Sequence, residues 1–177
     1  MEADKMTNLG KWSIVLVLII GIFACTQKST SPFKANSEPD GFGGIKWGTE
    51  FSEVKSDMVE SRSVANPTEP DVKIKIYYTK KGDILKMGEA QLDKIEYGFF
   101  RGKYAEGYIT STGPENFNQL KKFLFEKYGT VEKSTQGLYP WNGPVTRIAL
   151  RYDEPTKTSL LTISSTTITF KEIFDKD

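Results

Sequence analysis

The chain has 177 residues, with 24 basic and 23 acidic side chains and a formal net charge of +1. Such a balance offers no broad basic surface, so we expect no nucleic-acid partner. The chain contains no histidine, which excludes histidine metal ligands and nucleophiles activated by an imidazole. We therefore predict no cofactor, no metal site and no catalytic residue.

The first segment in chain order, residues 1–24, has the layout of a signal peptide. An uncharged apolar run of 13 residues, Trp12 to Ala24, follows Lys5 and Lys11. As a helix this run spans about 20 Å, which is less than the ~30 Å hydrocarbon core of a membrane. We therefore expect a cleavable signal rather than a permanent membrane-spanning helix.

The sequence Ile22-Phe23-Ala24-Cys25 resembles the lipobox of bacterial lipoproteins. The resemblance implies cleavage after Ala24, diacylglycerol on the thiol of Cys25, and acylation of the new amino terminus, for example with palmitate. Several acyl chains would hold the protein on a membrane almost without dissociation. The alternative is that Cys25 ends an uncleaved anchor or lies in an ordinary secretory signal. Because Thr26 rather than an aspartate follows, the resemblance implies the outer membrane, facing the periplasm.

The segment after the cysteine is predicted to be a flexible tether. Residues 26–40 are polar, contain proline and serine, and show no periodic apolar pattern. A flexible chain of this length reaches about 20 Å on average and about 50 Å when extended. We therefore divide the mature chain into a lipidated cysteine with its tether, residues 25–40, and a single domain, residues 41–177.

The first part of the domain is predicted to be one helix followed by three strands. Glycine-rich turns at 41–48 indicate a backbone folded over aromatic side chains, since the glycine spacing fits no phosphate-binding loop. Thr49 is expected to cap a helix of about three turns that reaches Met58, and residues 60–71 are predicted to be a loop. Alternating apolar residues then predict strands at 72–79, 92–99 and 104–110.

The second part repeats this order. The apolar stripe of Glu115 to Tyr128 predicts the longest helix, with a capping box from Thr112 and a stop at Gly129. Further strands are predicted at 131–139, 145–152 and 160–168. We therefore predict an α+β fold: an antiparallel sheet with two helices on one face, built from two α-β-β-β units. The alternative is an unrepeated α+β protein with the same order of elements.

Two groups of proteins share features with this chain. The Gly-Ile-x-Trp-Gly start at 44–48 and the Lys-Tyr-Gly helix end at 127–129 resemble a family of uncharacterised bacterial lipoproteins, a likeness that implies no known activity. The order of elements resembles small α/β envelope lipoproteins of the outer-membrane barrel assembly machinery, and β-lactamase inhibitor proteins built from tandem α-β repeats. The Leu-Gly-x-Pro sequence of those repeats is absent after Met58.

Each candidate for catalysis also has a simpler structural interpretation. Ser52-x-x-Lys55 and Lys157-Thr158-Ser159 match short motifs that resemble those of penicillin-recognising enzymes, whose fold is much larger, so we interpret the first lysine as a solvated helix residue. The acidic pairs Glu50–Glu53 and Asp153–Glu154 are placed at a helix start and in a turn. Asp83 and Asp153 are each expected to form a turn rather than bind calcium.

Aromatic residues on the predicted strands are the remaining candidates for a functional surface. If the strands alternate, some of these side chains lie on the sheet face without helices and form a docking surface for a protein or peptide. The alternative is that they fill a second small core under loops. The candidate partner-binding residues are Tyr104, Tyr108, Tyr139 and Trp141.

The sequence thus predicts a lipid-anchored bacterial envelope protein, a non-catalytic module that binds or assembles another macromolecule. The expected partners are a membrane, through lipid on Cys25, and an envelope protein or peptide. One alternative is an enzyme that uses carboxylates on cell wall or glycan. A second alternative is a carrier that holds a small ligand in an apolar pocket between helices and sheet.

Overall fold

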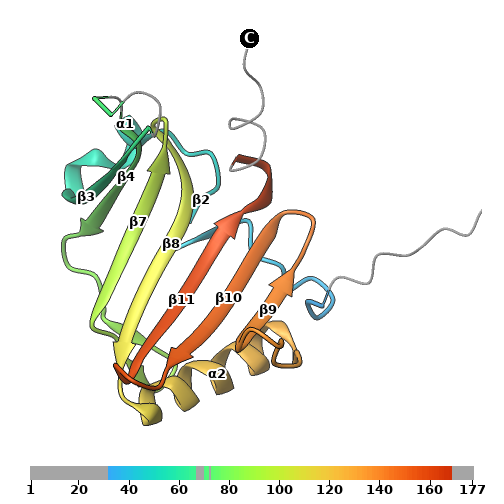
Figure 1. Ribbon diagram of the computed structural model, residues 1–177. Coiled ribbons are helices and arrows are strands. Elements are labelled where there is room, and N and C mark those ends of the chain that lie inside the picture. The colour runs from blue at the N-terminus through green and yellow to red at the C-terminus, as the bar shows by residue number, and fades with distance from the viewer. Residues whose placement is uncertain (1–31, 67–69, 72, 169–177) are drawn as a thin grey trace, which may run out of the picture.

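The computed structural model describes residues 32–66, 70–71 and 73–168. Its main element is a seven-stranded antiparallel sheet (Figure 1). The strands follow the order β3-β4-β7-β8-β11-β10-β9 across the sheet. Their bounds are β3 Met58–Ala65, β4 Lys73–Lys80, β7 Lys94–Phe100, β8 Lys103–Thr112, β9 Leu138–Asn142, β10 Thr146–Asp153 and β11 Thr158–Ser165. The last strands of the two halves, β8 and β11, pair at the centre and join two meanders into one sheet.

The helices α1 and α2 pack on the same face of the sheet, as predicted for two helices. The long helix α2, Pro114–Tyr128, buries Leu120 and Leu124 against it. The short helix α1, Phe51–Val54, packs through Phe51, whose ring stacks on that of Tyr78 with 4.2 Å between centroids. We call this side the helix-covered face. The other side, the open face, points to the viewer in Figure 1, where α2 passes behind the lower ends of the strands.

The core lies between the helix-covered face and the elements packed on it. Because alternate residues of a strand point to opposite faces, each central strand contributes every second side chain. The largest fully buried side chains are Tyr97, Phe99, Tyr104, Ile109, Leu120, Leu124, Trp141, Ile148, Leu150, Leu161 and Ile163. Each aliphatic member of this set stabilises the fold by about 1.5–3 kcal/mol relative to an exposed position.

Two short hairpins complete the helix-covered side. One consists of β1, Gly41–Phe42, and β2, Ile45–Lys46; the other consists of β5, Lys86–Met87, and β6, Ala90–Gln91. The Phe42 ring stacks on Tyr97, and a Cβ on Gly43, whose φ is +64°, would lie 2.5 Å from the same tyrosine ring. The glycines therefore allow backbone to pack on an aromatic side chain, which confirms that interpretation of residues 41–48.

The predicted first helix and the loop after it are wrong. α1 has only four residues, with Glu50 rather than Thr49 as its N-cap, and continues into a 3₁₀ turn, Lys55–Asp57. The edge strand β3 then occupies the first half of the predicted loop. The side chains of β3 are largely exposed on both faces of the sheet, so its sequence shows no apolar alternation. The strand is held in place by its backbone pairing with β4.

The two halves of the domain are therefore unequal. The second half has the predicted order, α2 followed by β9, β10 and β11. The first half has a four-residue helix and contributes four strands to the sheet, the extra one being β3. β9 also lies later than predicted, at Leu138–Asn142, because Pro140 is accommodated in an edge strand rather than in a turn.

The predicted tether is wrong for its second half, because residues 33–40 lie against the domain. Phe33 is only 8% exposed and packs edge-to-face on Tyr128, with 5.7 Å between ring centroids. Glu38 Oε1 accepts hydrogen bonds from the backbone N–H groups of Val145, at 2.7 Å, and Thr146, at 2.8 Å. An aromatic anchor and a carboxylate that satisfies two backbone donors fix this segment despite its polar composition.

The predicted signal peptide and Cys25 lie outside the described residues. Within the part of the chain that the structure describes, no helix is both long and apolar enough to span a membrane.

We expect the docked segment to contribute measurably to stability. Phe33→Ala should lower the free energy of unfolding by about 3 kcal/mol, because it removes a buried ring from its contact with Tyr128. Chemical denaturation measures this change, and Ala35→Ser, at an exposed position of the same segment, is the matched control. Equal unfolding midpoints for both variants would show that the segment behaves as the flexible tether that its composition suggests.

Candidate functional site

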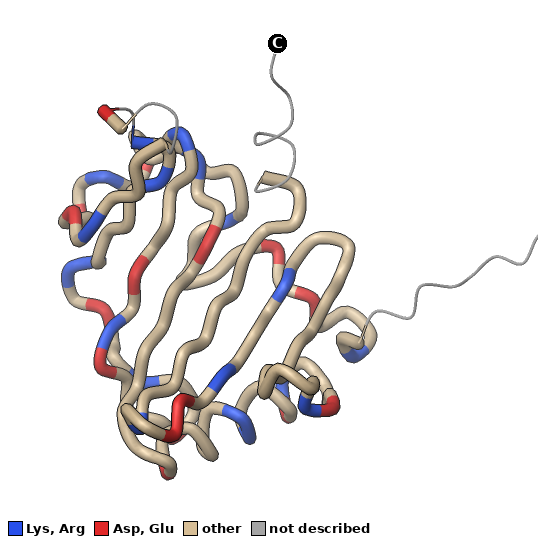
Figure 2. Tube along the Cα trace, viewed as in Figure 1, with Lys and Arg blue, Asp and Glu red and all other residues tan. Residues whose placement is uncertain are grey.

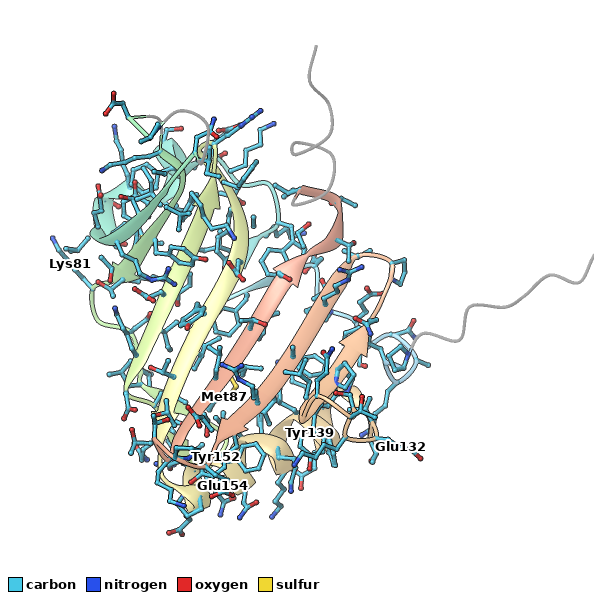
Figure 3. All side chains as sticks on the ribbon, viewed as in Figure 1. Lys81, Met87, Glu132, Tyr139, Tyr152 and Glu154 are labelled. Carbon is cyan, nitrogen blue, oxygen red and sulfur yellow. The ribbon has the colours of Figure 1, made fainter. Side chains whose placement is uncertain are left out.

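The structure separates the four aromatic residues predicted to bind a partner. Tyr108 lies on the open face and is half-buried. Tyr104 and Trp141 are 0% exposed and belong to the core. Tyr139 also lies on the helix-covered side, where its ring packs against Phe117 of α2, and Figure 3 shows it next to this helix. The prediction of a docking surface is therefore wrong for three of the four residues.

A bulge in β8 explains why Tyr104 and Tyr108 differ although an even spacing separates them. Gly98 of β7 pairs with Glu106, and the next residue, Phe99, pairs with Tyr104, so Ala105 is an extra residue in β8. An extra residue shifts the alternation of side chains by one position. Tyr104 therefore enters the core, whereas Tyr108 stays on the open face.

The open face carries instead a connected group of polar and aromatic side chains across β3, β4, β7 and β8. We call this group the Arg62 cluster. Its members are Ser61, Arg62, Lys75, Tyr77, Lys94, Glu96, Glu106 and Tyr108.

A second bulge, in β3, assembles one end of the cluster. Glu60 pairs with Tyr78 and Arg62 pairs with Tyr77, so Ser61 is the extra residue. Both Ser61 and Arg62 then reach Glu96: the serine hydroxyl donates to Glu96 Oε1 at 2.6 Å, and Arg62 Nε donates to Oε2 at 3.1 Å. Bulges re-aim side chains in this way at the edges of sheets.

The guanidinium of Arg62 is held between two tyrosine rings. Its central carbon lies 3.5 Å from the centroid of Tyr77 and 4.8 Å from that of Tyr108. A planar guanidinium is attracted to the negative face of an aromatic ring and loses little of its hydrogen-bonding capacity by stacking. The Arg62 side chain nevertheless remains 38% exposed, so part of it faces solvent.

Glu106 organises the other end of the cluster. Its Oε2 atom accepts hydrogen bonds from Tyr77 Oη at 2.7 Å and from Lys75 Nζ at 2.9 Å. The tyrosine ring lies over Gly98, where an added Cβ would approach it to 3.0 Å. Two causes raise the pKa of Tyr77: burial, which has the larger effect, and the nearby Glu106 carboxylate. The phenol therefore stays protonated and acts as a hydrogen-bond donor.

Glu96 is a buried carboxylate on a face that no described helix covers. It is 2% exposed, and its Oε1 atom also forms an ion pair with Lys94 Nζ at 2.7 Å. Burial alone would disfavour its charge, but the hydrogen bonds from Lys94, Ser61 and Arg62 outweigh burial and lower the pKa of Glu96. A general acid for glycoside hydrolysis needs a raised pKa, so this environment suits a charged structural group.

The remaining half of the open face, over β11, β10 and β9, has shorter side chains. Half-buried Thr162, Ser164 and Ala149 form its middle, with exposed Arg147 and Arg151 on β10. Figure 2 shows acidic positions on β7 and β8 and two basic positions along β10. This half therefore combines short side chains, two arginines and the half-buried apolar residues Pro140 and Leu160 beside the Arg62 cluster.

The residues that matched catalytic patterns have structural roles or exposed positions. Glu50 and Glu53 form a capping box on α1. In the second acidic pair, Asp153 accepts a hydrogen bond from the Thr156 hydroxyl and Glu154 pairs with Lys157 at 2.9 Å. Ser52 and Lys55 are both exposed. Among the described residues, no three His, Cys, Asp or Glu side chains come together as a metal-ligand set.

Concavities of the molecule flank the β1–β2 hairpin on the helix-covered side. One, of about 490 Å³, lies between this hairpin and the end of α2. Another, of about 390 Å³, is lined by Phe42, Tyr97 and Asp83 among others. Asp83 does more than form a turn, since its Oδ1 atom accepts a hydrogen bond from Tyr97 Oη at 3.1 Å. Both hollows are separate from the Arg62 cluster.

Sequence reasoning missed the centre of this site. Arg62 lies in a segment predicted to be a loop, and its partner Glu96 lies in a segment predicted to be a strand from its apolar residues. A signal was present, because Glu96 is a single charge within Ile95 to Phe100, and a charge in such a strand requires a partner when buried. The partner itself could not be found, since its strand shows no alternation.

Compared with known protein families, curated proteins and solved structures, the chain shows no match.

We expect Glu96 to make stability depend on pH in the acidic range. Its pKa is lower in the folded chain than in the unfolded one, so its contribution is complete above the unfolded-state value of about 4.3 and disappears as the pH falls through the folded-state value. Glu96→Gln should cost about 1–3 kcal/mol at pH 7 and should flatten the decline of stability below pH ~5. Urea denaturation at a series of pH values measures both effects.

Glu132→Gln, at an exposed glutamate, serves as the control and should leave the pH profile of unfolding unchanged. An equally steep acid decline in the Glu96→Gln protein would contradict the role assigned to this carboxylate.

Proposed function

We propose that this chain is a lipid-anchored bacterial envelope protein that binds another protein through the open face of its sheet. The single observation that carries the binding proposal is the exposed part of Arg62, held between two tyrosine rings on a face that no described helix covers. Arginine and tyrosine are enriched at protein interfaces, where they contribute more binding energy than most other residues.

The position of the two hollows described above, on the helix-covered side rather than at the Arg62 cluster, supports a macromolecular partner over a small ligand. Small-ligand sites are concave and enclose most of their ligand. Around the Arg62 cluster the described side chains are tied to one another by ion pairs and ring contacts, which gives a rigid surface. A rigid surface loses little conformational entropy when a partner docks on it.

Catalysis is not part of the proposal. The chain has no histidine, and hydrogen bonds lower the pKa of Glu96, the most buried carboxylate of the site. Both glutamates of the cluster are already bound by the protein's own lysine, arginine, serine and tyrosine side chains. Their role is to hold the surface together.

The proposed location is the outer membrane, facing the periplasm. It rests on the apolar run before Cys25, on the resemblance of residues 22–25 to a lipobox, and on Thr26 in place of an aspartate. Acyl chains on this cysteine would keep the domain at the membrane surface.

Lipid attachment can be tested directly in a Gram-negative host. A clickable palmitate analogue should label the wild-type chain, and intact mass spectrometry should find a mature protein that begins at Cys25. Cys25→Ser should lose the label and leave the membrane fraction, whereas Thr26→Ser should behave as wild type. A mature chain with an unmodified thiol would contradict the anchor.

Binding through the open face can be tested by photocrosslinking in intact cells. A photoreactive amino acid at Thr162, in the middle of this face, should give a discrete crosslink to one protein. The same amino acid at Lys122, which is exposed on α2, is the positional control. Ala149→Arg in the Thr162 background should abolish the crosslink, because Ala149 pairs directly with Thr162 across the strands and a long side chain there would block access to it. Equal crosslinking from both positions, or none from Thr162, would reject the proposal.

A further inference from the structure

The loop that follows β4 carries the most exposed large apolar side chain among the residues that the structure describes. Ile84 is 79% exposed, and its neighbour Leu85 is 42% exposed. We call residues 80–86 the Ile84 loop. Its two adjacent aliphatic side chains lie in water, although burial of each would be favourable. Adjacent exposed apolar residues with a polar rim are a feature of protein and membrane contact sites.

Lysines form the rim of this apolar tip. Lys80 and Lys81 precede it, and neither forms an ion pair with another described residue. Lys86 follows it and pairs with the exposed Glu89 at 3.2 Å. The one acid within the loop, Asp83, is half-buried, and its carboxylate is bound by a core tyrosine. The tip therefore presents an apolar centre with two unpaired positive charges beside it.

The backbone of the Ile84 loop is held in one conformation. Gly82, whose φ is +75°, allows the turn out of β4. Asp83 Oδ1 accepts a hydrogen bond from Tyr97 Oη at 3.1 Å, which fixes the turn to the core. The backbone N–H of Lys86 donates to the Ile84 carbonyl at 2.8 Å. A preformed tip loses little conformational entropy when it meets another surface.

The Ile84 loop lies on the same side of the sheet as the segment that leads to the proposed anchor. Gly88 follows the loop and lies against α2, since an added Cβ would come within 2.9 Å of the Phe123 ring. Phe33, in the docked segment, packs on Tyr128 of the same helix. In Figure 1 the loop follows the left edge of the sheet and the blue segment lies to the right. Two separated contacts on this side would fix how the domain lies on a surface.

We propose that the Ile84 loop inserts into the surface of a membrane that contains anionic phospholipid. Ile84 and Leu85 enter the boundary between headgroups and acyl chains, and Lys80 and Lys81 lie at the headgroup phosphates. Aliphatic side chains gain by leaving water there, and lysines are attracted to an anionic membrane surface. The loop is distinct from the open face, and the proposed anchor at Cys25 serves only to bring it near the bilayer. This contact directs the open face away from the lipid.

The surroundings of the loop favour a membrane over a protein partner. A stable protein interface buries more than about 1,000 Å² with complementary shapes. The apolar area of the tip does not extend over the neighbouring helix, because the exposed residues of α2 are polar: Glu115, Asn118, Lys122, Glu126 and Lys127. A bilayer, in contrast, can accept a single apolar tip with a cationic rim.

The test places a photoreactive amino acid at Ile84 of the mature protein isolated from the host. The protein is added to vesicles of phosphatidylethanolamine with about 30% phosphatidylglycerol, in which a trace of phospholipid carries a clickable acyl chain. We expect about fivefold more lipid labelling from this position than from Val145, an exposed apolar residue with no lysine next to it. Equal labelling from the two positions would overturn the inference.

Charge variants of the Ile84 protein test the cationic rim. The double change Lys80→Gln with Lys81→Gln should lower lipid labelling about threefold or more, as should vesicles without phosphatidylglycerol. The matched control is Lys103→Gln with Arg151→Gln, which removes two exposed cations from strands of the open face and should have little effect. Labelling that responds neither to the two lysines nor to phosphatidylglycerol would overturn the inference.

Two comparisons separate this inference from the proposed function. Positions 84 and 145 are compared within one protein and need no acyl chain on Cys25, so a failed palmitate label rejects the anchor alone. The photoreactive amino acid at Thr162 should give little lipid labelling, because the open face points away from the bilayer. Lipid labelling from Thr162 as strong as that from Ile84 would overturn the inference. A discrete protein crosslink from Ile84 in intact cells, without lipid labelling in vesicles, would also overturn it.

Discussion

An extra residue in β8, Ala105, controls which aromatic side chains the sheet buries and which it presents. On its amino-terminal side Tyr104 joins the core, where its ring stacks on that of Trp47, and on its carboxyl-terminal side Tyr108 faces out. Without the bulge, the two tyrosines would lie on one face, so either the core would lose the ring of Tyr104 or the open face would lose that of Tyr108. The composition of both faces depends on this one irregularity in pairing.

The bulge at Ser61 has a complementary effect at the edge of the sheet. It turns an exposed, weakly patterned strand into a support for a buried carboxylate, because both Ser61 and Arg62 reach Glu96. Charged hydrogen bonds of this kind offset the cost of removing a carboxylate from water only when the set is complete. These side-chain contacts connect the edge strand β3 to β7 across β4. They stabilise the position of β3 in the sheet although few of its side chains are buried.

The sequence could predict the elements whose residues repeat with a clear period. The stripe of α2 and the alternation of β4 and β11 lead directly to an α+β fold with helices on one face. It could not place β3, whose exposed residues show no period. It also could not show the bulges, because nothing local marks Ala105 or Ser61 as an extra residue; the partner strand decides the register. The candidate site depends on both bulges, so Tyr108 is the one member of the cluster that the sequence predicted for this face, and the others came from the structure.

The docked segment after residue 32 also limits how far the domain can travel from its anchor. If Cys25 carries lipid as proposed, only seven peptide units separate it from Pro32, and covalent geometry limits their span to about 25 Å. The domain would then explore a thin layer next to the bilayer instead of the depth of the surrounding compartment. Confinement of this kind raises the local concentration of any partner held in the same layer, so that even a millimolar contact could be occupied much of the time.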